Sequence, residues 1–266
     1  MNIEKMYEGE GGYVFVSHSH LDLKEVREVR NYLETSGLEP ILFYLRSMEN
    51  CDEGRLSLLR KLIYEEIDSR EFFLYLESEN SKNSQWVQEE IRYVNEKYPD
   101  KIISLPLSQG ADEIKKQLQA FVKKMRVFIS YSRVDTPLVE RLKTALVKRD
   151  FRVYANEDIL SPGASWGRQT KKTIKDISKE GSVIVVLTER SMQSVYIRME
   201  FAHALRCGGR IIPIVVGDVD LSKTEWSFLN GYPHFRMNKI DSDEEIEEFV
   251  NDFKKIVKEE TVKNKK

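Results

Sequence analysis

The sequence has few cysteines and histidines, and this scarcity excludes two classes of protein. Its 266 residues include only two cysteines, Cys51 and Cys207, which stand in different halves of the chain. A disulfide scaffold is therefore not expected, and a reducing cytoplasm fits the composition. The two cysteines and the four scattered histidines show no metal-ligand spacing, so we expect no metal site.

A basic excess, a long apolar run and a glycine-rich dinucleotide motif are also missing. The 42 basic and 44 acidic residues give a net charge of −2, which argues against nucleic acid as a partner. No apolar run reaches the roughly 18 residues of a membrane helix, and residues 1–6 do not resemble a signal peptide. Without a G-x-G-x-x-G motif, a redox Rossmann enzyme is not expected. These absences predict a cytoplasmic protein without a nucleic-acid or membrane partner.

One stretch occurs twice, which indicates a duplicated domain. Residues 126–135 read RVFISYSRVD, and residues 13–22 read YVFVSHSHLD, so the two copies begin 113 residues apart. Both combine an apolar run with a polar turn, a pattern typical of a buried strand that leads into a loop and a helix. Because the repeat period is the size of a domain, we expect two domains, at residues 1–122 and 123–266.

Apolar runs alternate with amphipathic segments through both halves. The predicted strands are 14–17, 40–45, 71–76, 101–107, 126–130, 151–154, 182–187 and 210–216. The predicted helices are 22–37, 56–67, 85–96, 112–123, 137–148, 166–178, 195–206 and 244–258, with fraying expected over 259–266. This order predicts the α/β class, with a parallel sheet covered by helices on both faces in each half. Sites in such sheets form beyond the carboxyl ends of the strands.

The loop after the third strand of each half carries the most distinctive pattern. Two serines, an aromatic residue and a glutamate recur at an offset of 110, as Ser81, Ser84, Trp86 and Glu90 and as Ser191, Ser194, Tyr196 and Glu200. The aromatic residue and the glutamate stand at i and i+4, on one helix face. Capping is an alternative explanation for the serines, and a solvated helix face is the default for the glutamates alone.

A second distinctive stretch, Asp158 to Trp166, reads DILSPGASW. Pro162-Gly163 is a turn signal, and Ser165 before Trp166 indicates a helix start. A turn alone explains the proline and glycine. The position of Trp166 is compatible both with core packing and with contact to a ligand.

These stretches resemble the TIR (Toll/interleukin-1 receptor) domain family, which implies two flavodoxin-like domains. Residues 127–132 look like the first-strand box of the family, and Asp158, Pro162 and Gly163 look like its BB loop. The first half is similar to the bacterial variant but has no Pro-Gly loop at 47–54, and the second has Tyr196 where enzymatic members usually carry tryptophan. The resemblance implies Glu90 and Glu200 as catalytic candidates. It implies substrate contacts at Ser17, His18, Ser81, Ser84, Trp86, Ser130, Tyr131, Arg133, Trp166, Ser191, Ser194 and Tyr196.

Enzymatic TIR domains cleave the nicotinamide–ribose bond of NAD⁺, and the residue pattern is compatible with that chemistry. Ordinary glycoside hydrolysis needs a second carboxyl group to protonate the leaving group. Nicotinamide leaves NAD⁺ as a neutral molecule, so one carboxylate that orients the ribose and stabilises the oxocarbenium-like transition state is sufficient. NAD⁺ is then a substrate, and no cofactor is expected.

We therefore hypothesise an assembly-dependent NAD⁺ glycohydrolase or cyclase, similar to the Thoeris-like TIR proteins of bacterial antiviral defence. Its expected partners are NAD⁺, other TIR domains and a downstream effector protein. The alternative is a non-enzymatic module that acts through TIR–TIR contacts alone. Each half lacks a feature that the other keeps: the first half has Trp86 but no Pro-Gly loop, and the second has that loop but carries Tyr196 in place of tryptophan. We therefore also expect residues 158–166 to complete the Glu90 site, within one chain or from a neighbouring chain.

Overall fold

The computed structural model describes residues 12–43, 52–155, 166–178, 181–238 and 242–263. It divides into two compact units, one of residues 12–122 and the other containing residues 123–266. No helix in these described segments combines the length and the apolar character that crossing a membrane requires.

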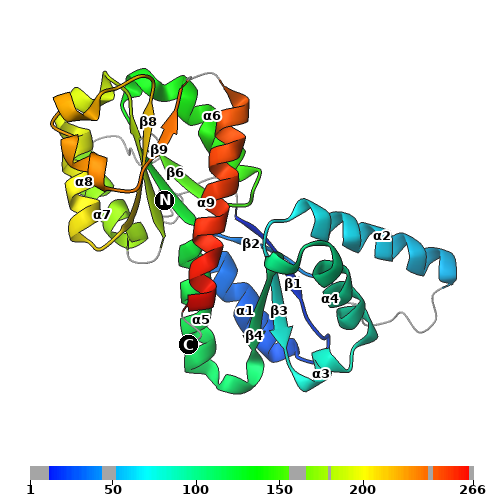
Figure 1. Cartoon of the computed structure of the whole chain (residues 1–266). Helices are drawn as coiled ribbons and strands as arrows, with labels where there is room; N and C mark the ends of the chain where they lie inside the picture. The colour runs from blue at the N-terminus through cyan, green and yellow to red at the C-terminus, as the bar shows by residue number, and fades with distance from the viewer. Residues whose placement is uncertain (1–11, 44–51, 156–165, 179–180, 239–241, 264–266) are drawn as a thin grey trace. The chain divides into compact units, whose positions relative to one another are not determined.

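The first unit is a four-stranded parallel sheet with helices on both faces (Figure 1). Its strands lie in the order β2-β1-β3-β4 and are β1 (Tyr13–Ser17), β2 (Glu39–Ile41), β3 (Phe73–Glu77) and β4 (Ile102–Pro106). Its helices are α1 (Leu23–Thr35), α2 (Glu53–Ser69), the short α3 (Glu79–Lys82), α4 (Gln85–Lys97) and α5 (Ala111–Lys124). Because all strands are parallel, the loops after β1 and β3 emerge at the same edge of the sheet.

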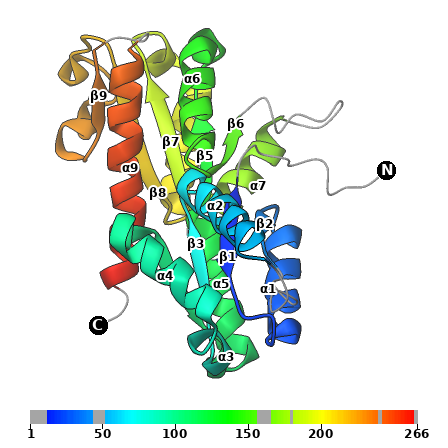
Figure 2. The same cartoon turned by 90° about the vertical axis from the view of Figure 1, so that its right-hand side faces the viewer.

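The core of the first unit is aromatic on the face that α2 and α4 cover. Phe15 of β1 and Phe73 of β3 stack with their ring centroids 5.2 Å apart. Ile63 and Ile67 of α2 and Val87 of α4 pack against them. The helices α1 and α5 cover the opposite face (Figure 2). Burial of apolar side chains on both faces is what holds a parallel sheet of this kind together.

The second unit is a five-stranded parallel sheet in the order β6-β5-β7-β8-β9. The strands are β5 (Arg126–Ser130), β6 (Arg152–Ala155), β7 (Ser182–Leu187), β8 (Arg210–Val216) and β9 (Phe235–Met237). The helices are α6 (Thr136–Val147), α7 (Trp166–Ser178), α8 (Val195–Arg206) and α9 (Asp243–Lys263). Figure 1 shows α7 and α8 on one face of this sheet and α6 and α9 on the other.

The central strand β7 organises the core of the second unit. All six of its residues are buried, as its continuous apolar sequence predicts. The segment after β8 adds Trp226, whose indole Nε1 donates a hydrogen bond to the carbonyl oxygen of Met192 at 2.9 Å. Phe201 of α8 meets the Trp226 ring edge to face, with the centroids 5.4 Å apart. These contacts fix the inner face of α8 against the sheet.

The α/β class and the parallel sheets flanked by helices are confirmed. The predicted strand 40–45 is wrong in extent, because β2 covers only Glu39–Ile41; part of that range lies outside the described residues. The predicted helix 244–258 is too short, because α9 continues to Lys263 in a stretch without glycine or proline, while fraying of residues 259–266 stays a prediction. The short elements α3 and β9 were not predicted, since three or four residues carry too little periodicity to detect.

Candidate active site

Two glutamates, Glu90 in α4 and Glu200 in α8, are buried at equivalent places in the two units. Each side chain is only 5% exposed. Ser17 Oγ, at the end of β1, donates a hydrogen bond of 2.5 Å to Glu90 Oε2. Ser130 Oγ, at the end of β5, donates an equivalent bond of 2.5 Å to Glu200 Oε2. The default expectation of a solvated helix face is therefore wrong for both glutamates.

The helix register explains why these carboxylates point inward. In α4, Val87 and Val94 are buried, and they stand three residues before and four residues after Glu90. In α8, Ile197 and Ala204 have the same relation to Glu200. Residues at these spacings share one helix face, so each glutamate lies within the apolar stripe that packs on its sheet.

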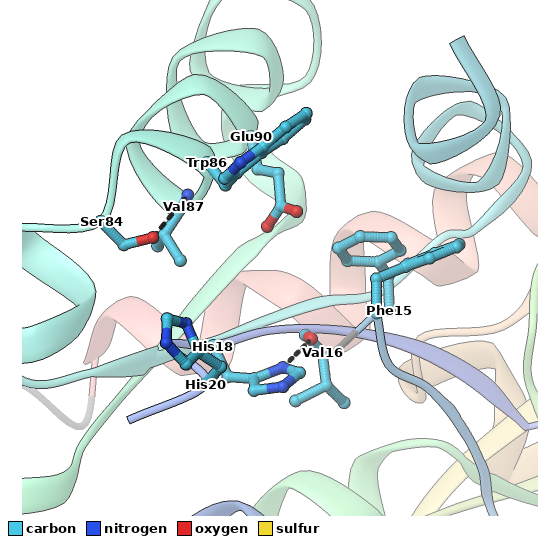
Figure 3. Close-up of a pocket in the computed structure, with 9 residues that line it drawn as sticks. Phe15, Val16, His18, His20, Ser84, Trp86, Val87 and Glu90 are labelled. Carbon is cyan, nitrogen blue, oxygen red and sulfur yellow. Dashed lines mark hydrogen bonds between the residues drawn. The ribbon is translucent and has the colours of Figure 1, made fainter. Parts of the chain in front are cut away.

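A cavity of about 70 Å³ opens beside Glu90 in the first unit (Figure 3). The Glu90 carboxylate points into this space from α4, and the rings of His18 and His20 lie across from it on the loop after β1. The residues that line the cavity are Phe15, Val16, His18, His20, Phe43, Ser84, Trp86, Val87 and Glu90. The first unit therefore places a carboxylate, an indole and two imidazoles around one small space.

Trp86 forms part of the cavity wall, and its ring is contacted by an arginine that is ion-paired with a neighbouring glutamate. The Arg60 guanidinium lies over the indole, 4.9 Å from the ring centroid. Arg60 Nε also donates to Glu89 Oε2 at 2.9 Å. A cation over an indole face is an attractive arrangement, and the ion pair with Glu89 limits the rotamers of the arginine. The orientation of Trp86 is thus supported by side chains of α2 and α4.

Burial dominates the electrostatics of the cavity. It raises the pKa of the Glu90 carboxyl from its ordinary value of 4.5 to about 7, although the bond from Ser17 opposes the shift. Burial also lowers the pKa of His18 below its ordinary value, so the neutral imidazole is favoured. His18 Nδ1 lies 3.1 Å from the carbonyl oxygen of Val16, which makes Nδ1 the protonated nitrogen of that neutral ring.

The second unit keeps the buried glutamate but changes its surroundings. Tyr196, the counterpart of Trp86, is 61% exposed and does not share the burial of Glu200. Tyr131 takes the position of His18 and is buried. Arg133, which stands where the first half has His20, is exposed. The two halves thus share a serine–glutamate pair but differ in the aromatic and basic groups near it.

Two serines of the repeated pattern cap helices, and the other two are buried and accept hydrogen bonds from the backbone. Ser84 and Ser194 are the N-caps of α4 and α8, which confirms capping for these two. Ser81 is fully buried within α3, where its hydroxyl accepts from the backbone N–H of Ser78 at 2.8 Å. Ser191 is equally buried, and its hydroxyl accepts from the backbone N–H of Thr188 at 2.7 Å. Of these serines, Ser84 lines the Glu90 cavity.

An aspartate ties the first and third loops of each unit together. In the first unit, Asp22 accepts hydrogen bonds from Ser78 Oγ at 2.5 Å and from Asn80 Nδ2 at 2.6 Å. In the second unit, Asp135 accepts from Thr188 Oγ1 at 3.1 Å. Both aspartates come five residues after the serine that binds the glutamate. We call the Asp22 contacts with Ser78 and Asn80, and the Asp135 contact with Thr188, the rim clamps.

The predicted BB-loop residues Asp158, Pro162 and Gly163 lie outside the described residues, as does the side chain of Trp166, whose backbone begins α7. Their assignment to substrate binding, and the expectation that residues 158–166 complete the Glu90 site, stay predictions. Within the described residues, no group of three or more His, Cys, Asp and Glu side chains could hold a metal ion.

Sequence reasoning did not single out several residues that surround the cavity. The missed lining residues are Phe15, Val16, His20, Phe43 and Val87, and Arg60, which lies over the Trp86 ring, was also missed. His20 was detectable in principle, because it belongs to the loop predicted to face this edge of the sheet. The other lining residues are apolar positions in a strand, a helix and a loop, where sequence indicates burial but not which cavity they border.

Comparison with known proteins assigns the family. The model of the TIR domain matches the chain twice, over residues 14–123 and 127–250. Together with the two parallel sheets flanked by helices, these matches show that the chain belongs to the TIR domain family. No curated protein matches the chain.

Two solved structures are similar to part of the chain. The TIR domains of the activated Roq1 resistosome, which directly recognizes the pathogen effector XopQ, are 19% identical, with 50% of this chain and 82% of that chain covered and a TM-score of 0.33. A flavoprotein from Thermotoga maritima is 15% identical, with 66% of this chain and 54% of that chain covered and a TM-score of 0.36.

Proposed function

We propose that this TIR protein is an NAD⁺ glycohydrolase or cyclase and that Glu90 is its catalytic carboxylate. The observation that carries the proposal is the buried Glu90, held by Ser17 and pointing into a cavity walled by Trp86. A carboxylate in a pocket, with a pKa raised by burial, is typical of a functional site. Glu200 has the same serine partner but an exposed aromatic counterpart, so it ranks second.

The proposed chemistry uses the charge of the Glu90 carboxylate. Positive charge moves from the pyridinium ring to the ribose as the bond to nicotinamide weakens. A carboxylate beside the ribose stabilises that charge more strongly in a water-poor cavity than in bulk water. The Ser17 bond fixes the carboxylate before the substrate arrives, so little reorganisation is needed during the reaction. Trp86 offers a flat apolar surface for the nicotinamide or the ribose.

The decisive experiment measures free nicotinamide after incubation of the full chain with NAD⁺. The assay is run on dilute protein and on protein concentrated or crowded to favour assembly, because activity in this proposal depends on assembly. Nicotinamide release that is lost in Glu90→Gln supports the assignment, since glutamine keeps the shape and removes the charge. Absence of release in every assembled form contradicts the enzymatic function.

An interaction module is the second candidate, and the outer face of α8 favours it. Val195, Tyr196 and Met199 are exposed apolar side chains on this helix, and Phe228 is exposed nearby, against Phe201. Exposed apolar groups that gather on one element are typical of protein contact sites. Sedimentation of the parent and of a Tyr196→Ala, Met199→Ala double variant tests this candidate, which predicts weaker self-association of the variant.

We place either activity in the bacterial cytoplasm and in antiviral signalling, with a downstream effector as partner. What supports this setting is the similarity of the sequence to TIR proteins of bacterial defence. Expression in bacteria with and without Glu90→Gln, followed by phage challenge, tests it. Equal phage sensitivity of the two strains and of a strain without the protein would contradict the defence role.

A further inference from the structure

We propose that His20 is the catalytic base that removes a proton from the water that completes NAD⁺ hydrolysis. The inference rests on the proposed function, because it names the second group of the same site. His20 lies on the loop after β1 and lines the cavity across from the Glu90 carboxylate (Figure 3). A substrate ribose held by Glu90 would thus lie between the carboxylate and the His20 imidazole, within reach of a water bound beside that ring.

The burial of the two histidines separates their roles. His18 is 7% exposed, and its Nδ1 is engaged with the carbonyl oxygen of Val16. Its ring therefore supports the loop and is shielded from water. His20 is half-buried, so solvent and the cavity both reach its side chain. A base that takes protons from bound water must pass them to bulk solvent, which suits the position of His20.

The carboxylate of Glu90 is less suited to this second task. One of its oxygens already accepts the bond from Ser17 Oγ, and its charge is needed beside the ribose while the bond to nicotinamide breaks. A neutral imidazole has one acceptor nitrogen and can take a proton without leaving the carboxylate neutral. The cavity therefore supplies separate groups for charge stabilisation and for proton removal.

The step balances in atoms and electrons. The bond between ribose C1′ and the pyridine nitrogen breaks, and its electron pair stays on nicotinamide, which leaves as a neutral molecule. The water oxygen forms the new bond to C1′, and one water proton moves to the His20 imidazole. The imidazolium then releases that proton to solvent. The products are nicotinamide, ADP-ribose and one proton, and no oxidant or reductant is required.

The second unit lacks this base at the equivalent position. Arg133 stands 113 residues after His20 and has only N–H donors, with no acceptor nitrogen. Its side chain is also exposed. The proposal therefore assigns water activation to the first unit alone.

The test compares two nucleophiles that can attack the ribose after nicotinamide leaves. Water must lose a proton in the reaction, whereas the nitrogen of a pyridine base has no proton to lose. The full chain, under conditions where it releases nicotinamide, receives NAD⁺ and 3-acetylpyridine. Base exchange gives the acetylpyridine dinucleotide, and hydrolysis gives ADP-ribose. In His20→Gln, the ratio of exchange to hydrolysis should rise about tenfold or more, because general base catalysis contributes at least that much. Since both products come from the same active molecules, partial misfolding does not change the ratio.

The matched control is His234→Gln, a histidine outside the cavity that is half-buried like His20 and whose Nδ1 contacts the backbone carbonyl of Tyr232. Its ratio should equal that of the parent. In His20→Ala, added imidazole should restore hydrolysis selectively. An active parent with an unchanged ratio in His20→Gln overturns the His20 assignment alone. A parent without any nicotinamide release overturns the proposed function, and the inference falls with it.

Discussion

The first and second units place the same serine–glutamate pair in different surroundings. Ser17 holds Glu90 beside a cavity with Trp86, His18 and His20 in its wall. Ser130 holds Glu200 at the same distance, but the counterpart Tyr196 is exposed to solvent. A buried carboxylate held by a serine is therefore not enough to identify a candidate active site. What distinguishes the units is the set of groups that a bound molecule would meet next to the carboxylate.

The largest expected difference concerns the two glutamates themselves. Glu90→Gln should lower NAD⁺ cleavage by about 10²–10³-fold, the loss expected when one preorganised electrostatic group is removed. Glu200→Gln should lower it by a smaller factor. The turnover of the two variants under assembled conditions makes the comparison directly. A greater loss in Glu200→Gln would reverse our ranking of the units.

The free energy of unfolding should depend on pH differently in the parent and in Glu90→Gln. The difference should be at most about 3 kcal/mol, which corresponds to a pKa of about 7 for Glu90 in the folded chain and 4.5 in the unfolded chain. Below pH 4.5 the carboxyl is protonated in both folded and unfolded chains. Between pH 4.5 and 7 the unfolded chain ionises while the folded chain keeps its proton, so the stability of the parent falls as the pH rises. Glutamine removes this dependence.

Urea unfolding of both proteins at pH 5 and pH 8 checks this expectation. The variant should gain stability relative to the parent between the two pH values, and the gain should be complete above pH 7. Glu96→Gln is a suitable control, because that glutamate lies on the same helix and its side chain is exposed. A difference between parent and Glu90→Gln that is the same at pH 5 and pH 8 would contradict a raised pKa for Glu90.

The two aromatic residues, Trp86 and Tyr196, should differ in their effect on KM, and this third difference should be smaller. Trp86→Ala should raise KM for NAD⁺ by about tenfold, because stacking of a base on an aromatic side chain is worth about 1–3 kcal/mol. Tyr196→Ala should change KM by less, since its ring is exposed. Steady-state kinetics of both variants decide the matter. Equal effects on KM would indicate that Tyr196 contacts the substrate in the assembled protein.

The smallest expected effects come from the serine partners. Ser17→Ala and Ser130→Ala each remove a hydrogen bond to a buried carboxyl group, which should cost about 1 kcal/mol of unfolding free energy. The loss of the Ser17 donor should also raise the pKa of Glu90 further, because that bond favours the ionised form. Denaturant unfolding and the pH profile of nicotinamide release measure both changes. A profile that does not move would show that Ser17 does not tune Glu90.

The order of strands and helices could be predicted from sequence because it depends on local periodicity and burial. The continuous apolar run 182–187 is a strand with all residues buried, and the predicted helices 166–178 and 195–206 match α7 and α8 at both ends. The inward direction of Glu90 was also encoded, through Val87 and Val94 on the same helix face. Its polar side chain, however, favoured a solvated position when considered alone.

The surroundings of the glutamates could not be predicted in the same way. Whether Tyr196 packs inward or faces solvent depends on how α8 lies on its sheet, and the repeated spacing is identical for Trp86. Likewise, Arg60 reaches Trp86 across two helices that are separate in sequence. Such contacts depend on tertiary packing, which a linear pattern of residue types does not specify.

The rim clamps have a consequence for how a duplicated domain can change. Asp22 and Asp135 hold the loops at the site edge through bonds that do not include Glu90 or Glu200. The hydrogen bonds that join these two loops therefore do not depend on the glutamates. Substitutions at positions such as 18, 20 and 86, or 131, 133 and 196, can alter what the edge binds while the loops stay anchored. Two copies of such a domain can thus differ in the groups around the carboxylate and keep the same architecture.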